Sequence, residues 1–246
     1  MNNIYIPPVV KNLLIINILF FIATLYFQSQ GTRLEYVLGA FYFDSPLAKP
    51  WQPITYMFMH GGWAHIFFNM FALYSFGTLL ESRWGMKKFI IFYLITGLGA
   101  LALQLGVQAF ETYQLTGSIF NPQAVSVDFG TSMVRANVKG LDNEQIGKLI
   151  DIYTTPMVGA SGAIFGLLVA FGMLYPNAEL LIMFIPVPVK AKYIIPVYIL
   201  VELSLGVAQI QGDSIAHYAH LGGALIGFIL VKIWKDKNDT FYTLYE

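Results

Sequence analysis

Three groups of polar residues lie within apolar stretches of this sequence, where they could do chemistry. The first holds His65 and Asn69, the second Ser161, and the third His217 and His220. A serine hydroxyl is a weak nucleophile that needs an adjacent base, and histidine is the commonest base. A serine, a histidine and a pair of hydrogen-bond donors are the components of acyl transfer. The residue types therefore predict Ser161 as nucleophile and His220 as general base.

The pair His65 and Asn69 has a spacing that suits a supporting role. On a helix these two residues share one face, and both side chains can donate hydrogen bonds. Two donors aimed into a cavity can stabilise the charge that develops on a carbonyl oxygen. We therefore expect His65 and Asn69 to contribute to an oxyanion hole.

Small residues surround Ser161 and His220. Ser161 lies in the run Gly-Ala-Ser-Gly, and His220 shares a helical face with two glycines. Small residues let helices approach closely in a membrane, so the pattern predicts a close contact between the two segments. Phe165, one turn after Ser161, is expected to stack on the His220 ring. The residues predicted to mediate helix packing are Gly159, Gly162, Gly166, Gly223 and Gly227.

Each of these residues also has a plainer interpretation. Ser161 could be an ordinary small residue at a helix contact, and His60 and His217 are predicted to be structural. Glu202 is expected near the middle of its helix, too deep to act as a third catalytic acid. No His-Glu-x-x-His motif occurs and no carboxylate ligand is expected near the histidines, so no metal site is predicted.

Composition places these residues in a membrane protein. The chain has 246 residues, of which 57% are hydrophobic and 11% charged, and its net charge is zero. Soluble domains are nearer a quarter charged. The balanced charge gives no indication of nucleic-acid binding. The absence of cysteine excludes disulfides, thiol catalysis and thiolate metal sites.

Apolar segments predict an all-α fold: a polytopic bundle of six transmembrane helices forming one domain over 1–246. A spanning helix needs about 20 apolar residues. The apolar run that follows Lys11 resembles a signal peptide, but no small-residue cleavage site follows it. A Pro-rich turn is expected near 186–190, and a five-span arrangement with a re-entrant segment is the alternative. The predicted spans are 12–29, 63–80, 88–109, 157–175, 191–210 and 216–234.

Lysine and arginine are more numerous on one side of this arrangement, which predicts that both termini lie inside. The second, fourth and sixth spans then all enter from the outer face. Their polar groups fall at one depth near the outer leaflet, which is why we expect them to form one site. The expected inner cations are Lys11, Arg83, Lys87, Lys88, Lys190, Lys192, Lys232, Lys235 and Lys237.

Two outer loops are long. The loop over 30–62 is rich in aromatic residues and proline and is expected to lie in the membrane interface. The loop over 110–156 is either a solvated insertion or a segment that affects substrate access. Within it, Asp142 is a candidate N-cap for a short amphipathic helix whose apolar residues include Leu149 and Tyr153.

Taken together, the motifs resemble the rhomboid family of intramembrane serine proteases. Four pieces that cover most of 50–230 carry the resemblance: Trp51-Gln52-Pro53 through His60 leading into His65 and Asn69; Glu81, Arg83 and Gly85; Gly159-Ala160-Ser161-Gly162 with Phe165; and Ala219-His220 with Gly223 and Gly227. Two positions depart from the family pattern: Gln52 stands where arginine is frequent, and Phe165 where tyrosine is frequent. The loop over 110–156 is also longer than in minimal six-span members.

The resemblance implies a serine-type endopeptidase that cleaves single-span membrane proteins within the lipid bilayer. Ser161 and His220 would form the dyad, and His65, Asn69 and the Ser161 backbone N–H the oxyanion hole. The fifth span would be a lateral gate, and no metal or organic cofactor would be used. The compact six-span form suggests a bacterial inner membrane, with the active site open to the outer face.

Two other classes of function remain open. A catalytically silent rhomboid-like binder or chaperone would share the fold, although Ser161 and His220 are both present here. A small transporter would be expected to show internal symmetry or a path of charges through the membrane, and Glu202 is the one candidate for such a charge.

Overall fold

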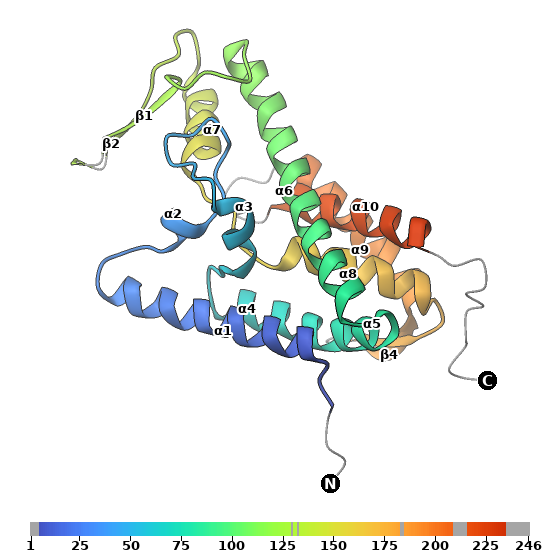
Figure 1. Cartoon of the computed structure of the whole chain (residues 1–246). Coiled ribbons are helices and arrows are strands. Elements are labelled where there is room, and N and C mark those ends of the chain that lie inside the picture. Colours follow the sequence, from blue (N-terminus) through green and yellow to red (C-terminus); the bar gives the residue numbers. More distant parts are fainter. Residues whose placement is uncertain (1–4, 129, 132, 183–184, 209–215, 235–246) are drawn as a thin grey trace.

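A computed structural model describes residues 5–128, 130–131, 133–182, 185–208 and 216–234. Within these residues the protein is a helical bundle with a smaller subdomain at one end (Figure 1). α1 begins and α10 ends at the same end of the bundle, opposite the subdomain. The predicted all-α, polytopic membrane fold is confirmed.

Five helices in the described part of the chain are long and apolar enough to cross a membrane. The second of them is continuous through a π-helical turn, η2 (Leu73–Gly77), that joins α4 to α5. Many of their large apolar side chains are exposed, as expected for surfaces that face lipid. The five are α1 (Pro8–Ser29), α4 to α5 (Trp63–Ala72 and Thr78–Trp84), α6 (Met86–Thr116), α9 (Ala191–Ala208) and α10 (His217–Trp234).

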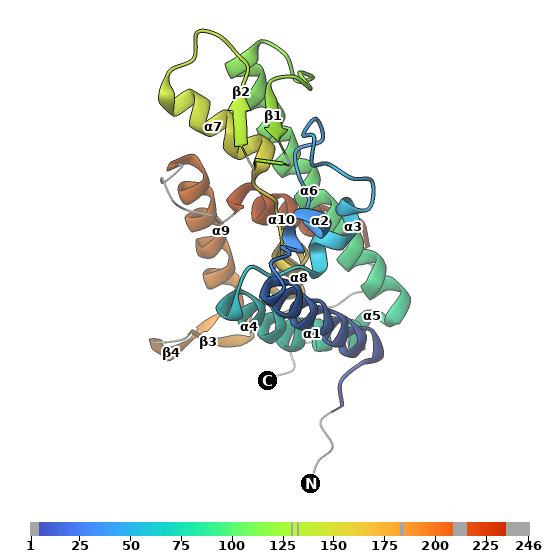
Figure 2. The same cartoon turned by 90° about the vertical axis from the view of Figure 1, so that its left-hand side faces the viewer.

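The predicted fourth span differs from the others. It is present as α8 (Ser161–Leu174), but it has only 14 residues and begins at Ser161 rather than at 157. Most of its residues are buried, because it lies in the centre of the bundle between α6 and α10 (Figure 2). A helix surrounded by other helices needs no lipid-facing surface, and irregular backbone at its start is sheltered by protein.

The start of α1 is held by a residue far along the chain. Glu81, buried in α5, accepts hydrogen bonds from the backbone N–H groups of Val9 and Val10 at 2.9 and 2.8 Å. The first N–H groups of a helix have no intrahelical partner and attract negative charge. Glu81 therefore fastens the start of α1 to the rest of the bundle.

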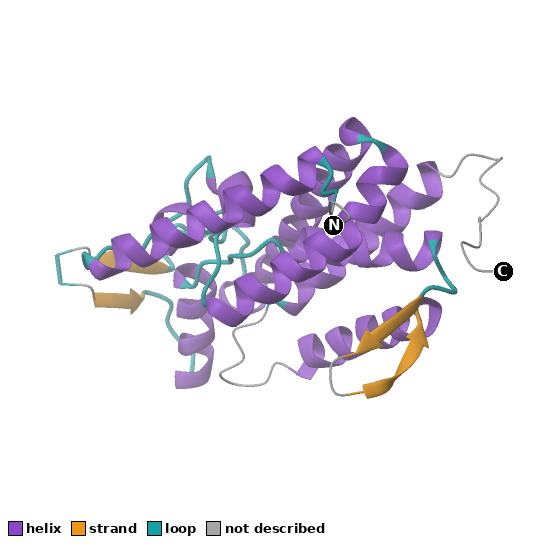
Figure 3. Ribbon diagram, turned by 90° about the horizontal axis from the view of Figure 1, so that it is seen from below, coloured by secondary structure: helices purple, strands orange, loops and turns teal. Residues whose placement is uncertain are grey.

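The Pro-rich segment after α8 differs from the prediction. Instead of a turn near 186–190, the chain forms an antiparallel pair of strands, β3 (Glu179–Ile182) and β4 (Ile185–Lys190). Each strand of a two-stranded sheet has one edge without a hydrogen-bonded neighbour. Proline is tolerated in a strand at such an unpaired edge. Together with α9 this sheet lies at the side of the bundle (Figure 3). α9 begins at Ala191, as predicted.

The subdomain is formed by the loop after α1, the last turns of α6 and the segment before α8. α6 continues to Thr116, beyond the predicted end at 109. The loop after α1 contains α2 (Glu35–Leu38), α3 (Gln52–Thr55) and the 3-10 turn η1 (Tyr56–Phe58). The later segment contains the hairpin β1 (Val125–Asp128) and β2 (Met133–Ala136), then α7 (Asn143–Thr154). Asp142 caps α7 in a capping box with Gln145, so the predicted amphipathic helix is confirmed.

This subdomain has a hydrophobic core of its own, which a purely solvated insertion would lack. Its buried side chains are Tyr42, Ala124, Val125, Leu149, Ile152 and Tyr153. Side-chain hydrogen bonds add to it: Ser45 donates to the Tyr153 carbonyl at 2.5 Å, and Tyr153 donates to Asp44 at 3.1 Å. The two long loops are therefore packed together as one unit.

Candidate active site

Ser161 is the first residue of α8, and the backbone before it is shaped by a glycine. Gly159 has a φ of +133°, a conformation that residues with a side chain rarely adopt. Its N–H donates to the Tyr56 carbonyl at 2.9 Å. A Cβ on Gly159 would lie 2.8 Å from His65 Nε2 and 3.4 Å from Ser161 Oγ. Gly159 was expected to mediate helix packing; it lies before the helix and keeps open the space between His65 and Ser161.

The other four predicted glycines do lie in helix contacts. A Cβ on Gly223 would be 1.8 Å from the Gly162 carbonyl oxygen, and a Cβ on Gly227 would be 2.7 Å from Gly166 Cα. On the opposite side, Gly162 faces Ala100 of α6 and Gly166 faces Thr96. α8 is therefore held between two helices at a distance that no larger residue would allow, and this brings the start of α10 to Ser161.

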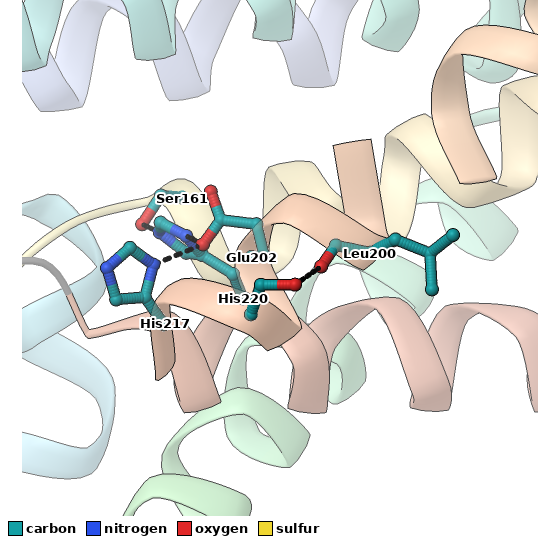
Figure 4. Close-up of polar contacts among 6 residues, drawn as sticks. Ser161, Leu200, Glu202, His217 and His220 are labelled. Carbon is teal, nitrogen blue, oxygen red and sulfur yellow. Dashed lines mark hydrogen bonds and ion pairs between the residues drawn. The ribbon is translucent and has the colours of Figure 1, made fainter. Parts of the chain in front are cut away.

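At that contact the structure places His220 beside Ser161. The distance between Ser161 Oγ and His220 Nε2 is 2.8 Å, a hydrogen-bond length, and the His220 side chain is buried (Figure 4). The ring of Phe165 lies parallel to the His220 ring, with the ring centroids 4.2 Å apart and the planes inclined by 8°. Phe165 in turn lies 5.1 Å from the ring of Tyr198 on α9. Packing on one face and a hydrogen bond at one edge thus orient the imidazole.

Glu202 lies much closer to His220 than the sequence predicted. Its Oε2 atom lies 2.9 Å from His220 Nδ1 and 2.7 Å from His217 Nδ1 (Figure 4). The expectation that Glu202 lies too deep to reach the base is wrong. Counting residues along α9 neglected the length of the glutamate side chain and the packing of α9 against α10. His217, expected to be structural at the membrane edge, is buried in this contact.

A signal for this contact was present in the spacing. Ala191, Ile195, Glu202 and Gly206 are the buried residues of α9, and they lie along one helical face. A carboxylate on the face that also carries a glycine is a candidate for a helix interface, since charged groups in membranes point into the bundle.

The same three side chains have types that can bind metal. Glu202, His217 and His220 each offer one ligand atom, and these atoms lie within 4.8 Å of one another. The expectation that no carboxylate lies near the histidines is therefore wrong. The Nδ1 to Oε2 distances are nevertheless hydrogen-bond lengths, and the other nitrogen of His220 faces Ser161. The contacts form a hydrogen-bonded chain from Glu202 through His220 to Ser161.

The predicted oxyanion donors lie on α4. Asn69 is buried, and its amide nitrogen Nδ2 has no hydrogen-bond partner in the described structure. A buried donor without a partner costs about 1–3 kcal/mol. His65 is half-buried, and its Nδ1 accepts weakly from Gly61 N–H at 3.4 Å. The other ring nitrogen of His65, Nε2, lies on the side that faces Gly159 and Ser161.

His60 packs against His65. It is fully buried with neither ring nitrogen hydrogen-bonded in the described structure, and its ring centroid is 5.0 Å from that of His65. Its contact with the His65 ring agrees with the structural role that was predicted for it.

Comparison with known proteins adds independent information. Residues 47–236 match the family model of the Rhomboid domain. Rhomboid protein 1, mitochondrial, of Saccharomyces cerevisiae is 28% identical over 174 residues, which cover 70% of this chain and 38% of that protein. Rhomboid protease AarA of Providencia stuartii is 26% identical over 201 residues, which cover 79% of this chain and 59% of the relative.

Rhomboid protease GluP of Bacillus subtilis is 28% identical over 178 residues, covering 72% of this chain and 25% of that protein. The chain thus spans less than two thirds of the length of these relatives. The family model itself covers most of the sequence and includes all three polar groups described above. This match, together with the helical membrane fold, shows that the chain belongs to the rhomboid family.

Proposed function

We propose that this protein is an intramembrane serine endopeptidase in which Ser161 is the nucleophile and His220 the general base. The observation that carries the proposal is the 2.8 Å contact between Ser161 Oγ and His220 Nε2 at the buried start of α8. A serine paired with histidine in this way is activated for attack on a carbonyl carbon. Relatives named as proteases in two bacteria support the same reaction.

The first half of the proposed reaction forms an acyl-enzyme. His220 Nε2 takes the hydroxyl proton as Ser161 Oγ bonds to the carbonyl carbon of a peptide in an unwound membrane segment. The oxyanion is stabilised by the backbone N–H of Ser161, which has no intrahelical partner at a helix start, and by His65 and Asn69. The C–N bond then breaks, and His220 gives its proton to the leaving amine.

The second half reverses these roles with water as the nucleophile. Water from the outer face gives a proton to His220 as its oxygen bonds to the acyl carbon. The bond to Ser161 breaks, and the proton returns to Oγ. We propose single-span membrane proteins as the substrates, because one unwound helix is enough to bring a peptide bond to the depth of Ser161.

The direct test is labelling of the purified, folded protein with a fluorophosphonate probe, which reacts with activated serines. We expect rapid labelling of the wild type and none of Ser161→Ala or His220→Ala, with all three proteins folded. Equal labelling of the three, or no labelling of folded wild type, would contradict the proposal and favour the silent binder.

The oxyanion role is tested separately. The unpartnered amide of Asn69 supports it, and Asn69→Ala should lower the rate of substrate cleavage about 10²–10³-fold, as for the loss of one oxyanion donor. Phe68→Ala, an exposed neighbour on the same helix, is the control and should cleave normally. Unchanged cleavage by Asn69→Ala would remove this residue from the mechanism.

The chain is an integral multi-pass membrane protein, and we propose that both termini face the cytoplasm of a bacterial cell. The distribution of Lys and Arg supports this orientation. Because the chain has no cysteine, single cysteines can report it. We expect an impermeant maleimide to label Ser126→Cys on intact cells and to label Lys190→Cys only after lysis. The opposite pattern would invert the topology.

A further inference from the structure

We propose that Glu202 is a positioning residue that fixes the tautomer of His220, and that it does so only while α9 is docked against α10. This inference rests on the proposed function, because it concerns how the base of that reaction is set. It concerns a third residue, outside the Ser161 and His220 pair, on a helix that contributes no other side chain to the hydrogen-bonded chain.

The first step of the argument is the direction of the hydrogen bonds. An ionised carboxylate can only accept, so a Glu202 oxygen 2.9 Å from His220 Nδ1 requires a hydrogen on Nδ1. In a neutral imidazole the other nitrogen is then bare. Nε2 of His220 is therefore an acceptor, which is the form that can take the Ser161 proton at 2.8 Å. The reverse tautomer would point a hydrogen at Ser161 and block the transfer.

The second step concerns His217, which shares the same carboxylate oxygen. His217 Nδ1 lies 2.7 Å from Glu202 Oε2, so two ring N–H groups converge on one atom. Two donors favour the charged form of a carboxylate that is buried in the bundle. His217 thereby keeps Glu202 an acceptor, and the carboxylate can also offset the positive charge that His220 gains during the reaction.

The third step is the place of Glu202 in the fold. α9 has the smallest buried share of the five long helices, 22%, whereas the others range from 28% to 44%. Its buried residues form one narrow face, and Figure 2 shows the helix at the edge of the bundle. At the end near His220 this face rests on α10 through Glu202 and Gly206, where a Cβ would lie 3.2 Å from His217 Cβ.

These contacts link the position of α9 to the state of the base. Moving the end of α9 away from α10 would separate Glu202 from both histidines and leave His220 free to adopt either tautomer. Tyr198 would also leave the Phe165 ring that stacks on His220. The catalytic residues on α8 and α10 are held by glycine contacts, so α9 is the part of the site whose docking can vary.

The first test is the second-order rate of fluorophosphonate labelling of the full-length protein. We expect Glu202→Gln to label about 10²–10⁴-fold more slowly than wild type, since the corresponding Asp→Asn change in a Ser-His-Asp triad costs about 10⁴ in kcat. Glu202→Asp keeps the carboxylate and should recover part of the rate. Ser204→Ala changes an exposed α9 residue whose hydroxyl donates to the Leu200 carbonyl, and it should label like wild type.

Labelling of Glu202→Gln within twofold of wild type would overturn the inference and leave the proposed function intact. Failure of the proposed function is a different result, in which wild type and His220→Ala label alike. If Glu202 had a purely structural role, Glu202→Gln would lower the melting temperature and the labelling rate together. Glu202→Asp would then not restore the labelling rate separately from the melting temperature.

A second measurement holds even where a Glu202 variant does not fold. The chain has four histidines, so nitrogen-15 NMR of selectively labelled wild-type protein can resolve their tautomers. We expect His220 to carry its hydrogen on Nδ1, with Nε2 unprotonated, at neutral pH. A hydrogen on Nε2 would overturn the inference.

The dependence on α9 docking has its own test. Gly206→Leu should push α9 away from α10, because even a Cβ at position 206 would lie only 3.2 Å from His217 Cβ. We expect labelling to slow, and the double variant Gly206→Leu, Glu202→Gln to be no slower than Glu202→Gln alone. Ser204→Leu introduces the same side chain at an exposed position and should have no effect. Multiplicative slowing in the double variant would show two independent effects and overturn the coupling.

Discussion

The bundle around α8 and the subdomain at its end are held together by different means. In the bundle, the contact between α8 and α10 depends on glycines that let backbones meet, as at Gly223 and the Gly162 carbonyl. In the subdomain, buried aromatic and aliphatic side chains form a small core, supported by hydrogen bonds to Asp44 and Ser45. The first region resembles membrane proteins in its packing and the second resembles a small soluble domain.

Membrane-spanning helices and a region with a hydrophobic core of its own are stabilised by different physical effects. Lipid is as apolar as leucine, so helices in a membrane gain little by burying apolar surface and depend on close packing and polar contacts. A region in water gains about 25 cal/mol for each Å² of apolar surface that it buries. Substitutions that add volume should therefore damage the bundle most, whereas those that remove a polar partner should damage the subdomain locally.

The largest expected effect is that of Gly223→Leu. Its Cβ would lie 1.8 Å from the Gly162 carbonyl oxygen, so α8 and α10 would have to separate. We expect a loss of about 4 kcal/mol or more, which is in the range that abolishes folding. Thermal unfolding in detergent measures it. Gly106→Leu is the matched control, because Gly106 is exposed and a Cβ there meets nothing within 4 Å; leucine there should stabilise α6 by up to about 1 kcal/mol.

If both glycine variants were destabilised by similar amounts, close approach of the α8 and α10 backbones would not be what stabilises the bundle. The comparison between the bundle and the subdomain would then fail.

Next in size is Glu81→Ala, which tests how much a polar contact contributes within the bundle. The change leaves the N–H groups of Val9 and Val10 without their acceptor. We expect a loss of about 2–3 kcal/mol, the scale of hydrogen bonds to a charged group, measured by the same unfolding assay. Glu81→Gln retains one acceptor oxygen and should lose less. A negligible loss for both would mean that the packing of α1 against the bundle suffices without this cap.

A smaller effect is expected from Tyr153→Phe in the subdomain. Burial first, and the neighbouring Asp44 charge second, raise the pKa of the Tyr153 hydroxyl, so it remains a donor at neutral pH. Its loss should cost about 1 kcal/mol and increase hydrogen exchange in α7, while Ser161 labels at the wild-type rate. Tyr113→Phe, an exposed position on α6, is the control. Slower labelling of Tyr153→Phe would show that the two regions are coupled.

The smallest expected effect is that of Asp142→Ala, which removes the N-cap of α7. We expect a loss of about 0.5–1 kcal/mol that is confined to the first turn of α7, seen as faster hydrogen exchange there. Gln145→Ala removes the reciprocal half of the capping box and should cost less. Global destabilisation by either change would mean that the subdomain and the bundle unfold as one unit.

Much of the fold could be predicted from the sequence because it depends on local chemistry. Long apolar runs specify helices in a membrane whatever their neighbours are, since each helix satisfies its own backbone hydrogen bonds. The capping box at Asp142 and the glycine pattern of α10 are likewise local signals. His65 and His220 lie in the first turns of α4 and α10, where counting residues along the spans placed them, whereas Ser161 is the first residue of α8 and not in its second turn.

Only the tertiary structure decided the rest. The packing of α9 against α10 brings Glu202 to His220 and His217. The spacing along α9 indicates that Glu202 lies on an interface face, but not which residues it meets. The role of Gly159 depends on a backbone angle of +133° set by its bond to Tyr56. The core of the subdomain joins residues from two loops that are distant in sequence. Local sequence determines which elements form, whereas contacts between distant residues are set by how those elements pack in three dimensions.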